Sequence, residues 1–353
     1  MRGPLKTIMA AIFLLLAGSS PPEPRHAVPG TPQRFEGTLA VMTYNVKGLP
    51  WPVAVGRGAA FDRIAARLRR MRERGGAPQV VVLQEAFTAE AQAIGAAAGY
   101  RYIVSGLPAD VSTPAVMEAG DRRFAAGGRW WKGETEGKWI GSGLLLMSDY
   151  PVVAVRRMAF PTFACAGYDC LANKGALLVT LAIPGAPSPV DVLTTHLNSR
   201  RASHAAMKRS LYAYRRQVGA LTAFIRAAHD PSHPLIAAGD FNVGGSAPRR
   251  SALLGDVQQR WAAGPVRDAL RSFRSAGGRL AADAAFSLRR ARDWQFYADG
   301  GVARLTLTGI DVPFGHEPGG GMLSDHVGYV ARYRFDRRGL EAEAPTTPSR
   351  SKA

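Results

Sequence analysis

Short apolar runs recur along the chain, and each ends at a polar or charged side chain. Residues 39–44 lead into Asn45, residues 80–83 into Gln84 and Glu85, residues 190–195 into His196, and residues 235–239 into Asp240. Runs of about four to eight apolar residues with β-branched content are typical of buried strands. The pattern therefore predicts four buried strands, each with a polar residue at its carboxyl end.

Segments between these runs carry apolar residues at helical spacing. Phe61, Ile64, Leu68 and Met71 form one stripe, and Met207, Leu211, Tyr214, Val218 and Leu221 form another, on a longer helix that ends near His229. Strands that alternate with helices indicate an α/β domain whose chemistry gathers at the strand ends. Two more strands are predicted over residues 176–182 and 327–333. Residues 108–138 are rich in Gly, Arg and Trp without a clear period, so a long loop or insertion is expected there.

The first 20 residues have the pattern of a secretory signal peptide. Arg2 and Lys6 give a positive start, residues 8–17 are apolar, and small residues follow at 18–20. The apolar run is short for a membrane span, and an uncleaved anchor or a buried helix is the alternative. We expect a linker over residues 21–34, a single domain over residues 35–334 and a polar, disordered tail over residues 335–353. The protein is thus expected to be secreted or periplasmic.

Charge and cysteine content give only weak information on the substrate and on the cellular compartment. The formal net charge is +18, or +16 without Arg2 and Lys6. Such a charge fits nucleic acid, an anionic membrane surface or phosphate-bearing substrates, and it does not choose between them. Cys165 and Cys170 are the only cysteines. In an exported protein such a close pair is expected to form a disulfide, which would shape the loop between them.

The polar residues at the strand ends suit phosphodiester hydrolysis. That reaction needs a hard cation on the phosphate oxygens, a base that activates water, and donors that hold the developing charge. Mg²⁺ prefers oxygen ligands. The candidates are Asn45, Glu85, Asp240, Asn242, Asp293 and Asp325, with His196 and His326 as imidazoles. Each has an ordinary alternative when taken alone: Glu85 could cap a helix that begins near Thr88, and Asp240 with Asn242 could form a turn.

Taken together, five short motifs match a family pattern in order. They are Thr43-Tyr44-Asn45-Val46-Lys47-Gly48, Leu83-Gln84-Glu85, Thr195-His196-Leu197-Asn198, Gly239-Asp240-Phe241-Asn242 and Ser324-Asp325-His326. These motifs resemble successive signatures of the endonuclease/exonuclease/phosphatase (DNase I-like) superfamily across residues 35–334. The resemblance implies a four-layer α/β sandwich, in which two packed, mostly antiparallel sheets are flanked by helices. It also implies a metal-dependent phosphodiester hydrolase.

The resemblance implies a metal site and a base. Glu85 corresponds to the main ligand of Mg²⁺, with Mn²⁺ or Co²⁺ as substitutes. Asn45 would assist Glu85 in binding the metal, and Asp325 would contribute to the metal site. His326 corresponds to the general base that takes a proton from water, and Asp293 is its expected orienting carboxylate.

Further roles follow from the same resemblance. Asp240 and Asn242 would orient water or the leaving group and hold phosphate oxygens, and His196 would donate to a phosphate oxygen. The segment that contains Asp293 departs from the family's Asp-Tyr-Ile-Phe pattern. It has Trp294 in place of Tyr and Gln295 in place of an apolar residue.

Residues 165–175 bear on the substrate. They resemble the Cys-Gly-x-Asp-x-x-x-Asn-Lys-Gly element of bacterial sphingomyelinases and keep the Asp-to-Lys spacing of neutral sphingomyelinases. Lys174 would place a cation near the phosphate, and Asp169 would pair with it or release it. The alternative is an ordinary hairpin with a surface Asp–Lys pair.

Trp130 and Trp131 stand beside cationic residues in the sequence Arg-Trp-Trp-Lys. Adjacent tryptophans of this kind suit a membrane interface. They could equally belong to a core or stack on nucleic-acid bases.

Three functions are compatible with these features. The first is a secreted sphingomyelinase-like phospholipase C that cleaves sphingomyelin, or a related phospholipid, to ceramide and phosphocholine. The alternative is a secreted DNase I-like nuclease, for which nucleic acid would be the partner. A non-catalytic module is disfavoured, because each catalytic position is filled by a competent residue. We expect a monomer that contacts a phospholipid membrane through the Trp130/Trp131 region.

Overall fold

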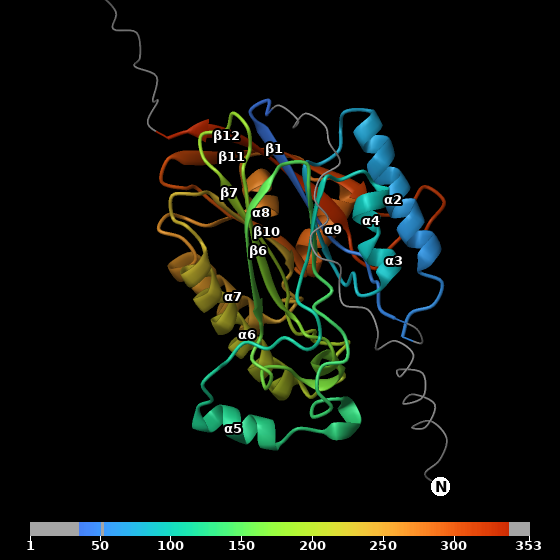
Figure 1. The fold of residues 1–353 in the computed structure, drawn as a ribbon, viewed down its shortest axis with the longest axis vertical. Coiled ribbons are helices and arrows are strands. Elements are labelled where there is room, and N and C mark those ends of the chain that lie inside the picture. The colour runs from blue at the N-terminus through green and yellow to red at the C-terminus, as the bar shows by residue number, and fades with distance from the viewer. Residues whose placement is uncertain (1–34, 51–52, 339–353) are drawn as a thin grey trace, which may run out of the picture.

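Two mixed sheets of six strands each form the centre of the protein (Figure 1). The computed structural model describes residues 35–50 and 53–338. The first sheet has the order β11 (Ala303–Phe314), β12 (Gly328–Arg337), β1 (Thr38–Asn45), β2 (Val80–Gln84), β4 (Leu145–Ser148) and β3 (Tyr102–Ser105). The second has the order β5 (Val152–Ala159), β6 (Gly175–Leu181), β7 (Val190–His196), β8 (Leu235–Asp240), β10 (Asp293–Ala298) and β9 (Arg267–Asp268). The pairs β1/β2 and β7/β8 are parallel, and the other neighbouring strands are antiparallel.

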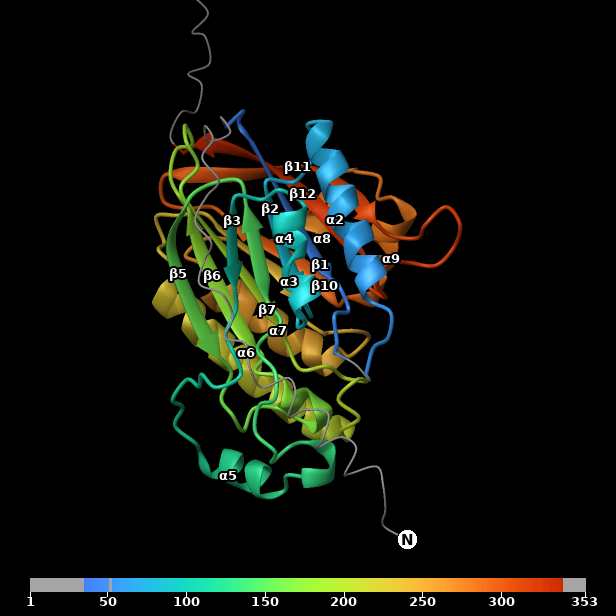
Figure 2. The same cartoon turned by 45° about the vertical axis from the view of Figure 1, so that its right-hand side comes forward.

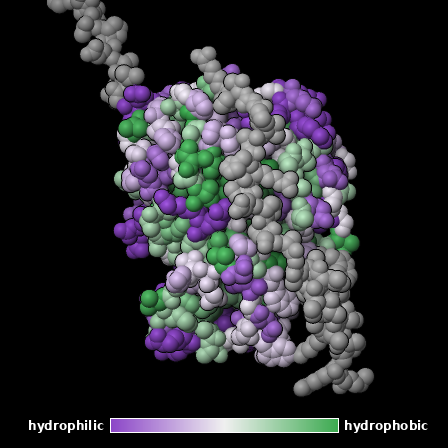
Figure 3. All heavy atoms as spheres, in the orientation of Figure 1, coloured by the Kyte–Doolittle hydropathy of each residue, from purple (hydrophilic) through white to green (hydrophobic). Residues whose placement is uncertain are grey.

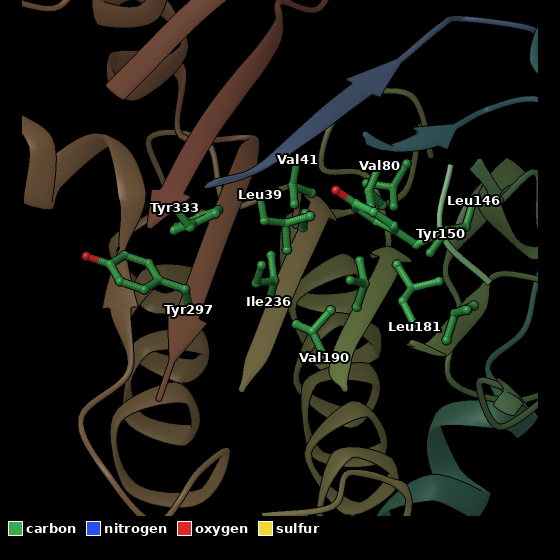
Figure 4. Packing of buried hydrophobic residues seen from close by; sticks show 14 of the residues in the cluster. Leu39, Val41, Val80, Leu146, Tyr150, Leu181, Val190, Ile236, Tyr297 and Tyr333 are labelled. Atoms are coloured by element: carbon green, nitrogen blue, oxygen red, sulfur yellow. The ribbon is translucent and has the colours of Figure 1, made fainter. Parts of the chain in front are cut away.

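Apolar side chains fill the space between the two sheets and alternate along each strand. In β1, Leu39 and Val41 belong to this inner core, whereas Met42 belongs to a second core on the outer face. Figure 4 shows Leu39 beside Ile236 of β8 in the inner core. Because the central strands are covered on both faces, they appear in the sequence as continuous apolar runs instead of alternating ones.

Helices cover the outer face of each sheet or, in the case of the short helical elements within residues 119–132, lie beyond the end of the sheets (Figure 1). They are α2 (Gly58–Glu73), α3 (Ala89–Gln92), α4 (Ile94–Ala97), α5 (Ala119–Ala126), α6 (Met207–Ala228), α7 (Ala247–Arg260), α8 (Ala269–Ser275) and α9 (Ala282–Arg290), with 3₁₀ turns η1 (Trp130–Lys132) and η2 (Gly167–Leu171). The stripe of α2 that includes Phe61 packs on the first sheet, and the stripe of α6 that includes Val218 packs on the second. In Figure 2, α2, α3 and α4 lie on one side of the sheets and α6 and α7 on the other. The expected four-layer α/β sandwich is confirmed.

Residues 108–138, expected to be a long loop or insertion, form an insertion that is not entirely loop. They include α5 and η1, which lie beyond the end of the sheets (Figure 1). Buried Asp121 accepts hydrogen bonds from Tyr212 and Arg216 of α6, both at 2.8 Å, and Phe124 stacks on Tyr212. Glu134 accepts from Nε of Arg209 at 2.7 Å. These contacts with α6 order the insertion even though its sequence has little periodicity.

The last strand is longer than expected. β12 runs through Arg337, which pairs with Ala303 of β11, so residues 335–337 belong to the sheet and not to a tail. The expected signal peptide (1–20), the linker (21–34) and the tail from residue 339 lie outside the described residues. Among residues 35–50 and 53–338, no helix has the length and apolar character needed to cross a membrane.

The hydrogen bonds of Gln295 explain why a polar residue can replace the apolar residue of the family pattern at this buried position. Its Nε2 donates to the carbonyl of Val41 at 3.1 Å and to that of Tyr329 at 3.3 Å, and its Oε1 accepts from the hydroxyl of Tyr333 at 3.3 Å. A fully buried amide with these partners is satisfied. It joins β10 to β1 and β12 across the interior.

Candidate functional site

The ends of several strands meet at one edge of the sandwich. In the parallel pairs, Asn45 lies opposite Gln84 and His196 lies opposite Asp240. The antiparallel strand β10 begins where β8 ends, because Asp293 lies opposite Asp240. β1 and β2 also contact β8 of the other sheet. Polar residues far apart in the sequence are therefore brought together here.

His326 and Asp293 form a buried pair. Nδ1 of His326 lies 2.8 and 2.9 Å from the two carboxylate oxygens of Asp293. Because a carboxylate accepts, Nδ1 carries a proton, and in the neutral ring Nε2 keeps the lone pair. Nε2 faces Oδ2 of Asp240 at 3.8 Å. Burial alone would lower the pKa of His326, but the negative charges of Asp293 and Asp240 outweigh it and raise the pKa to about 9.

Asp240 lies at the centre of the polar cluster. Its Oδ2 accepts from Nδ2 of Asn45 at 3.1 Å and lies 3.6 Å from Nε2 of His196. Its Oδ1 accepts from the backbone N–H of Asn242 at 3.0 Å. Nδ2 of Asn45 also donates to Oε1 of Glu85 at 2.9 Å. One amide group thus holds two carboxylates that would otherwise repel each other.

The backbone is strained at two of these residues. Glu85 has φ of 56° and Asn242 has φ of 49°, in the left-handed region that few residues other than glycine adopt. The Glu85 carbonyl accepts from the N–H of Gly48 at 2.9 Å, and a Cβ on Gly48 would lie 2.4 Å from that oxygen. Thr88, and not Glu85, caps α3 by accepting from Ala91. Such strain persists where surrounding structure enforces it, commonly at active sites.

Lys174 is buried and fully hydrogen-bonded. Its Nζ lies 2.9 Å from Oδ2 of Asp169, 3.1 Å from Nε2 of His196 and 3.3 Å from the carbonyl of Leu197. Since an ammonium only donates, Nε2 of His196 accepts and the ring proton sits on Nδ1. Burial lowers the pKa of His196 well below its usual value, and Lys174 lowers it further, so the ring is neutral. In this arrangement His196 does not offer the Nε2 proton that its predicted donation to phosphate needs.

The loop that carries Asp169 is held at several points. Cys165 and Cys170 form the expected disulfide. It joins the two ends of the short loop that contains Asp169. The Asp169 carboxylate also accepts from the backbone N–H of Ser199. Glu134 of the insertion accepts from the N–H of Gly167 at 2.8 Å. The Asp169–Lys174 pair is therefore a buried, anchored contact and not a surface pair on a hairpin.

Arg249 was not singled out from the sequence, yet it supports the site. It is 1% exposed, and its guanidinium donates to the carbonyls of Asn198 at 2.6 Å and Asn242 at 2.9 Å and to Oγ of Ser210 at 2.6 Å. It also lies over the ring of Tyr214. Burial lowers the pKa of Arg249 to about 10. Its position near the start of a polar helix gives no sequence signal for burial, because its acceptors are brought to it by the complete fold.

Replacement of Arg249 by methionine is expected to lower the free energy of unfolding by about 3 kcal/mol, because it leaves buried carbonyls without donors. Chemical denaturation followed by circular dichroism measures this change. Arg250→Met is the matched control, since Arg250 is exposed on the same helix. Equal stability of the two variants would contradict a structural role for the buried guanidinium.

The donor set fits a divalent cation. Ligand atoms of Glu85, His196 and Asp240 lie within 4.8 Å of one another, as do those of Asp240, Asp293 and His326. Carboxylate oxygens are the ligands that Mg²⁺ prefers. Burial raises the pKa of Glu85, and the nearby carboxylate of Asp240 raises it further, against the opposing hydrogen bond of Asn45. A cation between the two carboxylates would relieve this cost.

Two other residues predicted to bind the metal, Asn45 and Asp325, do not present a ligand oxygen beside that of Glu85. The amide oxygen of Asn45 accepts from the N–H of Lys47 at 3.0 Å, so Asn45 turns its Nδ2 toward the carboxylates. Asp325 is exposed beside the site and belongs to neither of the two potential ligand groups. Its carbonyl accepts from Arg290. Glu85 and Asp240 are therefore the carboxylates best placed for a cation.

Comparison with known proteins agrees with this geometry. A sequence profile described as the endonuclease/exonuclease/phosphatase family matches residues 42–326. Comparison with curated proteins gave no match by sequence.

Solved structures with the same fold include enzymes and toxins. Sphingomyelinase C from Streptomyces griseocarneus is 21% identical, with a TM-score of 0.54 over 84% of this chain and 99% of that chain. A beta toxin variant from Staphylococcus aureus with bound magnesium ions is 15% identical, with a TM-score of 0.54 over 83% and 98%. TDP2 from D. rerio, complexed with a single-strand DNA product, is 15% identical, with a TM-score of 0.53 over 84% and 98%. At these identities the likeness establishes the fold.

Proposed function

Because the chain belongs to the endonuclease/exonuclease/phosphatase family, whose members are metal-dependent phosphoesterases, we propose that it is a secreted, Mg²⁺-dependent phosphodiesterase. The observation that carries this proposal is the buried His326–Asp293 pair, which faces the Asp240 carboxylate and the neighbouring Glu85 at one edge of the sandwich. The disulfide between Cys165 and Cys170 supports an oxidising, exported environment.

His326 serves as the general base. Asp293 fixes the proton on Nδ1 and stabilises the imidazolium that forms, so Nε2 takes the proton from the attacking water. Glu85 and Asp240 would hold the cation, and Asn45 positions both carboxylates. When bound, the cation neutralises charge on the phosphate oxygens and favours neutral His326.

Lys174 and Asn242 would donate to the phosphate oxygens. Lys174 can turn one of its three N–H groups to a phosphate oxygen if it releases Asp169 or His196. Asn242 is held by Asp240 and by the carbonyl of Leu197, which its Nδ2 contacts at 3.0 Å. Release of Lys174 would also free Nε2 of His196, so that the ring could donate to phosphate after a change of tautomer.

The substrate we propose is sphingomyelin or a related phospholipid, cleaved to ceramide and phosphocholine. The buried contact of Lys174 with Asp169, anchored by the disulfide loop, supports this choice. Purified protein with Mg²⁺ is therefore tested on vesicles of sphingomyelin and of phosphatidylcholine and on DNA, with and without a chelator. Chelator-sensitive release of phosphocholine is the expected result. Absence of phosphocholine with every divalent ion would remove this substrate.

Lys174→Met is expected to reduce turnover by about 100-fold, the effect of losing one preorganised donor to the developing charge. The reason is that the buried ammonium contacts His196 directly and lies at the edge where the strand ends meet. Initial rates at saturating substrate measure it, and Arg226→Met, at an exposed position near the end of α6, is the control. A variant that kept its full rate would place Lys174 outside the reaction.

A membrane surface is the proposed partner. Trp130, Trp131 and Tyr168 are 51%, 56% and 48% exposed, and the backbone near Tyr168 is tied to the loop of Lys174 by Asp169. Over the face drawn in Figure 3, hydrophobic and hydrophilic residues are mixed, including the lower part where α5 lies in Figure 1. A local aromatic cluster close to the site is therefore a better candidate for membrane contact than a broad apolar face. We expect the enzyme to act as a monomer.

Replacing Trp130 and Trp131 together by alanine is expected to weaken binding to sphingomyelin-containing vesicles by at least about tenfold, since each indole would lose apolar burial in the lipid. Co-sedimentation with vesicles measures the binding. Val116→Ala is the control, because Val116 is 90% exposed in the same insertion. Unchanged vesicle binding in the double variant would exclude this surface.

A second candidate function is a secreted nuclease. A cavity lined by arginines adjoins Asn242, and this observation favours a polyanionic substrate. The two candidates differ in the charge expected beside the scissile phosphate, because choline is a cation and a nucleic-acid neighbour is an anion.

A further inference from the structure

A cavity of about 240 Å³ beside Asn242 is unusually basic. Its lining includes Arg200, Arg201, Arg289, Arg290 and Arg292. The other lining residues are Ser199, Asn242, Gly244 and Gly245, so among the described residues no acidic or aromatic side chain lines it. A quaternary ammonium group is recognised by aromatic faces, which this cavity does not offer.

The arginines come from segments that carry the site. Arg200 and Arg201 follow β7, which ends at His196. Arg289 and Arg290 end α9, and Arg292 directly precedes Asp293 of β10. Ala291, with φ of 50°, turns the chain between helix and strand. The cavity is thus built onto the strands that supply two of the catalytic candidates.

The positive charge in this cavity is poorly compensated. Within residues 35–50 and 53–338, Arg200, Arg201, Arg289 and Arg292 form no ion pair with a carboxylate. Arg290 donates to the carbonyl of Asp325. Burial lowers the pKa of Arg290 and the charge of Arg292 lowers it further, whereas the nearby carboxylates of Asp293, Asp325 and Asp240 raise it. The other four arginines have no carboxylate of the described chain in ion-pair contact, so they favour an incoming anion, and guanidinium groups match phosphate oxygens in pairs.

A second concavity continues from the first. It has a volume of about 400 Å³, shares Arg200 and Gly245 with the arginine cavity, and is lined partly by apolar Met207, Leu211 and Pro248. The helices α6 and α7 begin there, and neither has an acidic residue in its first turn or a side-chain cap. Their positive ends add to the attraction for an anion. The charged cavity would suit a phosphate, and the adjoining, partly apolar cavity would suit the nucleoside attached to that phosphate.

We propose that the arginine cavity binds the phosphate adjacent to the scissile phosphate of a nucleic-acid strand, and that the second concavity receives the attached nucleoside. This inference rests on the second candidate function, and it adds the residues that select the substrate. The arginines position the strand and take no part in proton transfer. The arginines therefore contribute to the affinity for substrate, and this contribution increases with the number of phosphates in the substrate.

The test uses three thymidine dinucleotides that share one scissile phosphodiester: one without a terminal phosphate, one with a 5′-phosphate and one with a 3′-phosphate. Product chromatography in Mg²⁺ gives kcat and KM for cleavage of the internal bond. We expect the full-length enzyme to prefer one phosphorylated dinucleotide by about tenfold in kcat/KM, the usual effect of one charged contact to phosphate. The R200A/R289A double variant should lose this preference through a higher KM for the phosphorylated dinucleotide, with kcat for the internal bond changed much less than KM.

Arg226→Ala is the matched control, since Arg226 is exposed at the far end of α6, about 27 Å along the helix from Lys208. It should keep the preference, and thermal melting should show that all variants are folded. Equal cleavage of the three dinucleotides, or a preference that survives in R200A/R289A, overturns the inference and leaves the hydrolase function intact. No cleavage of any dinucleotide, with cleavage of sphingomyelin or of a phosphoinositide instead, removes the nuclease candidate and the inference with it.

Discussion

Substitution of His326 by glutamine is expected to lower kcat/KM for phosphodiester hydrolysis by about 10²- to 10⁴-fold, the range lost with a general base. Glutamine can still donate to Asp293, but it cannot take a proton from water. The imidazole it replaces is 4% exposed and held by Asp293 at 2.8 Å, so little repacking is needed. Steady-state kinetics at saturating Mg²⁺ measure the change.

His316→Gln is the control for this variant, because His316 also pairs with an aspartate, Asp283, but lies on the surface away from the site. Asp293→Asn gives an independent check through the pH profile. The rate rises with pH as His326 loses its proton, and Asp293 is the largest influence that raises the pKa of His326. The rising limb should therefore move to lower pH in Asp293→Asn, with a reduced plateau. A limb that stayed in place would remove His326 from the role of base.

The sequence was most informative where strands end. Asn45, His196 and Asp240 are the last residues of their strands, and Asp293 is the first residue of its strand. Parallel pairing places the end of β7 beside the end of β8, and antiparallel pairing places the start of β10 there. Packing of the two sheets brings the end of β1 to the same edge, so a linear pattern becomes a spatial cluster. The buried strands were also recognisable, because coverage on both faces produces uninterrupted apolar runs. The fold and the cluster of polar residues could thus be anticipated from local pattern together with the family motifs.

The supporting contacts could not be anticipated in the same way. Glu134 fixes the Asp169 loop from an insertion whose sequence has no clear period, and Arg249 joins two backbone segments from the first turn of a helix. Neither has a periodic signal, since the partners are backbone groups whose positions depend on the complete fold. The arginine cavity is a similar case. Arg200 and Arg289 are 89 positions apart in the sequence and converge only because β7 and β10 both border β8.

Glu85→Gln is expected to abolish metal-dependent turnover and to change how the protein responds to Mg²⁺. A cation at 100 times its dissociation constant stabilises a folded protein by about 2.7 kcal/mol, which for a domain of this size raises Tm by about 4 °C. The wild type should show this rise. The variant should show almost none, because the substitution removes the carboxylate charge, while the amide oxygen that remains can still accept from Asn45. Differential scanning calorimetry with and without Mg²⁺ measures this response.

Without metal, the wild type should be less stable than Glu85→Gln at pH values above the pKa of Glu85. The folded-state pKa of Glu85 is raised by burial above its usual value of 4.5, so ionisation opposes folding. Stability of the metal-free wild type should therefore fall as pH rises from that value through the raised pKa, and the variant should lack this component. Glu73→Gln, at an exposed position near the end of α2, should behave as wild type in both respects. A normal Mg²⁺-induced rise in Glu85→Gln would mean that the cation binds elsewhere, and the proposed arrangement of base, carboxylates and phosphate at this edge would then be untenable.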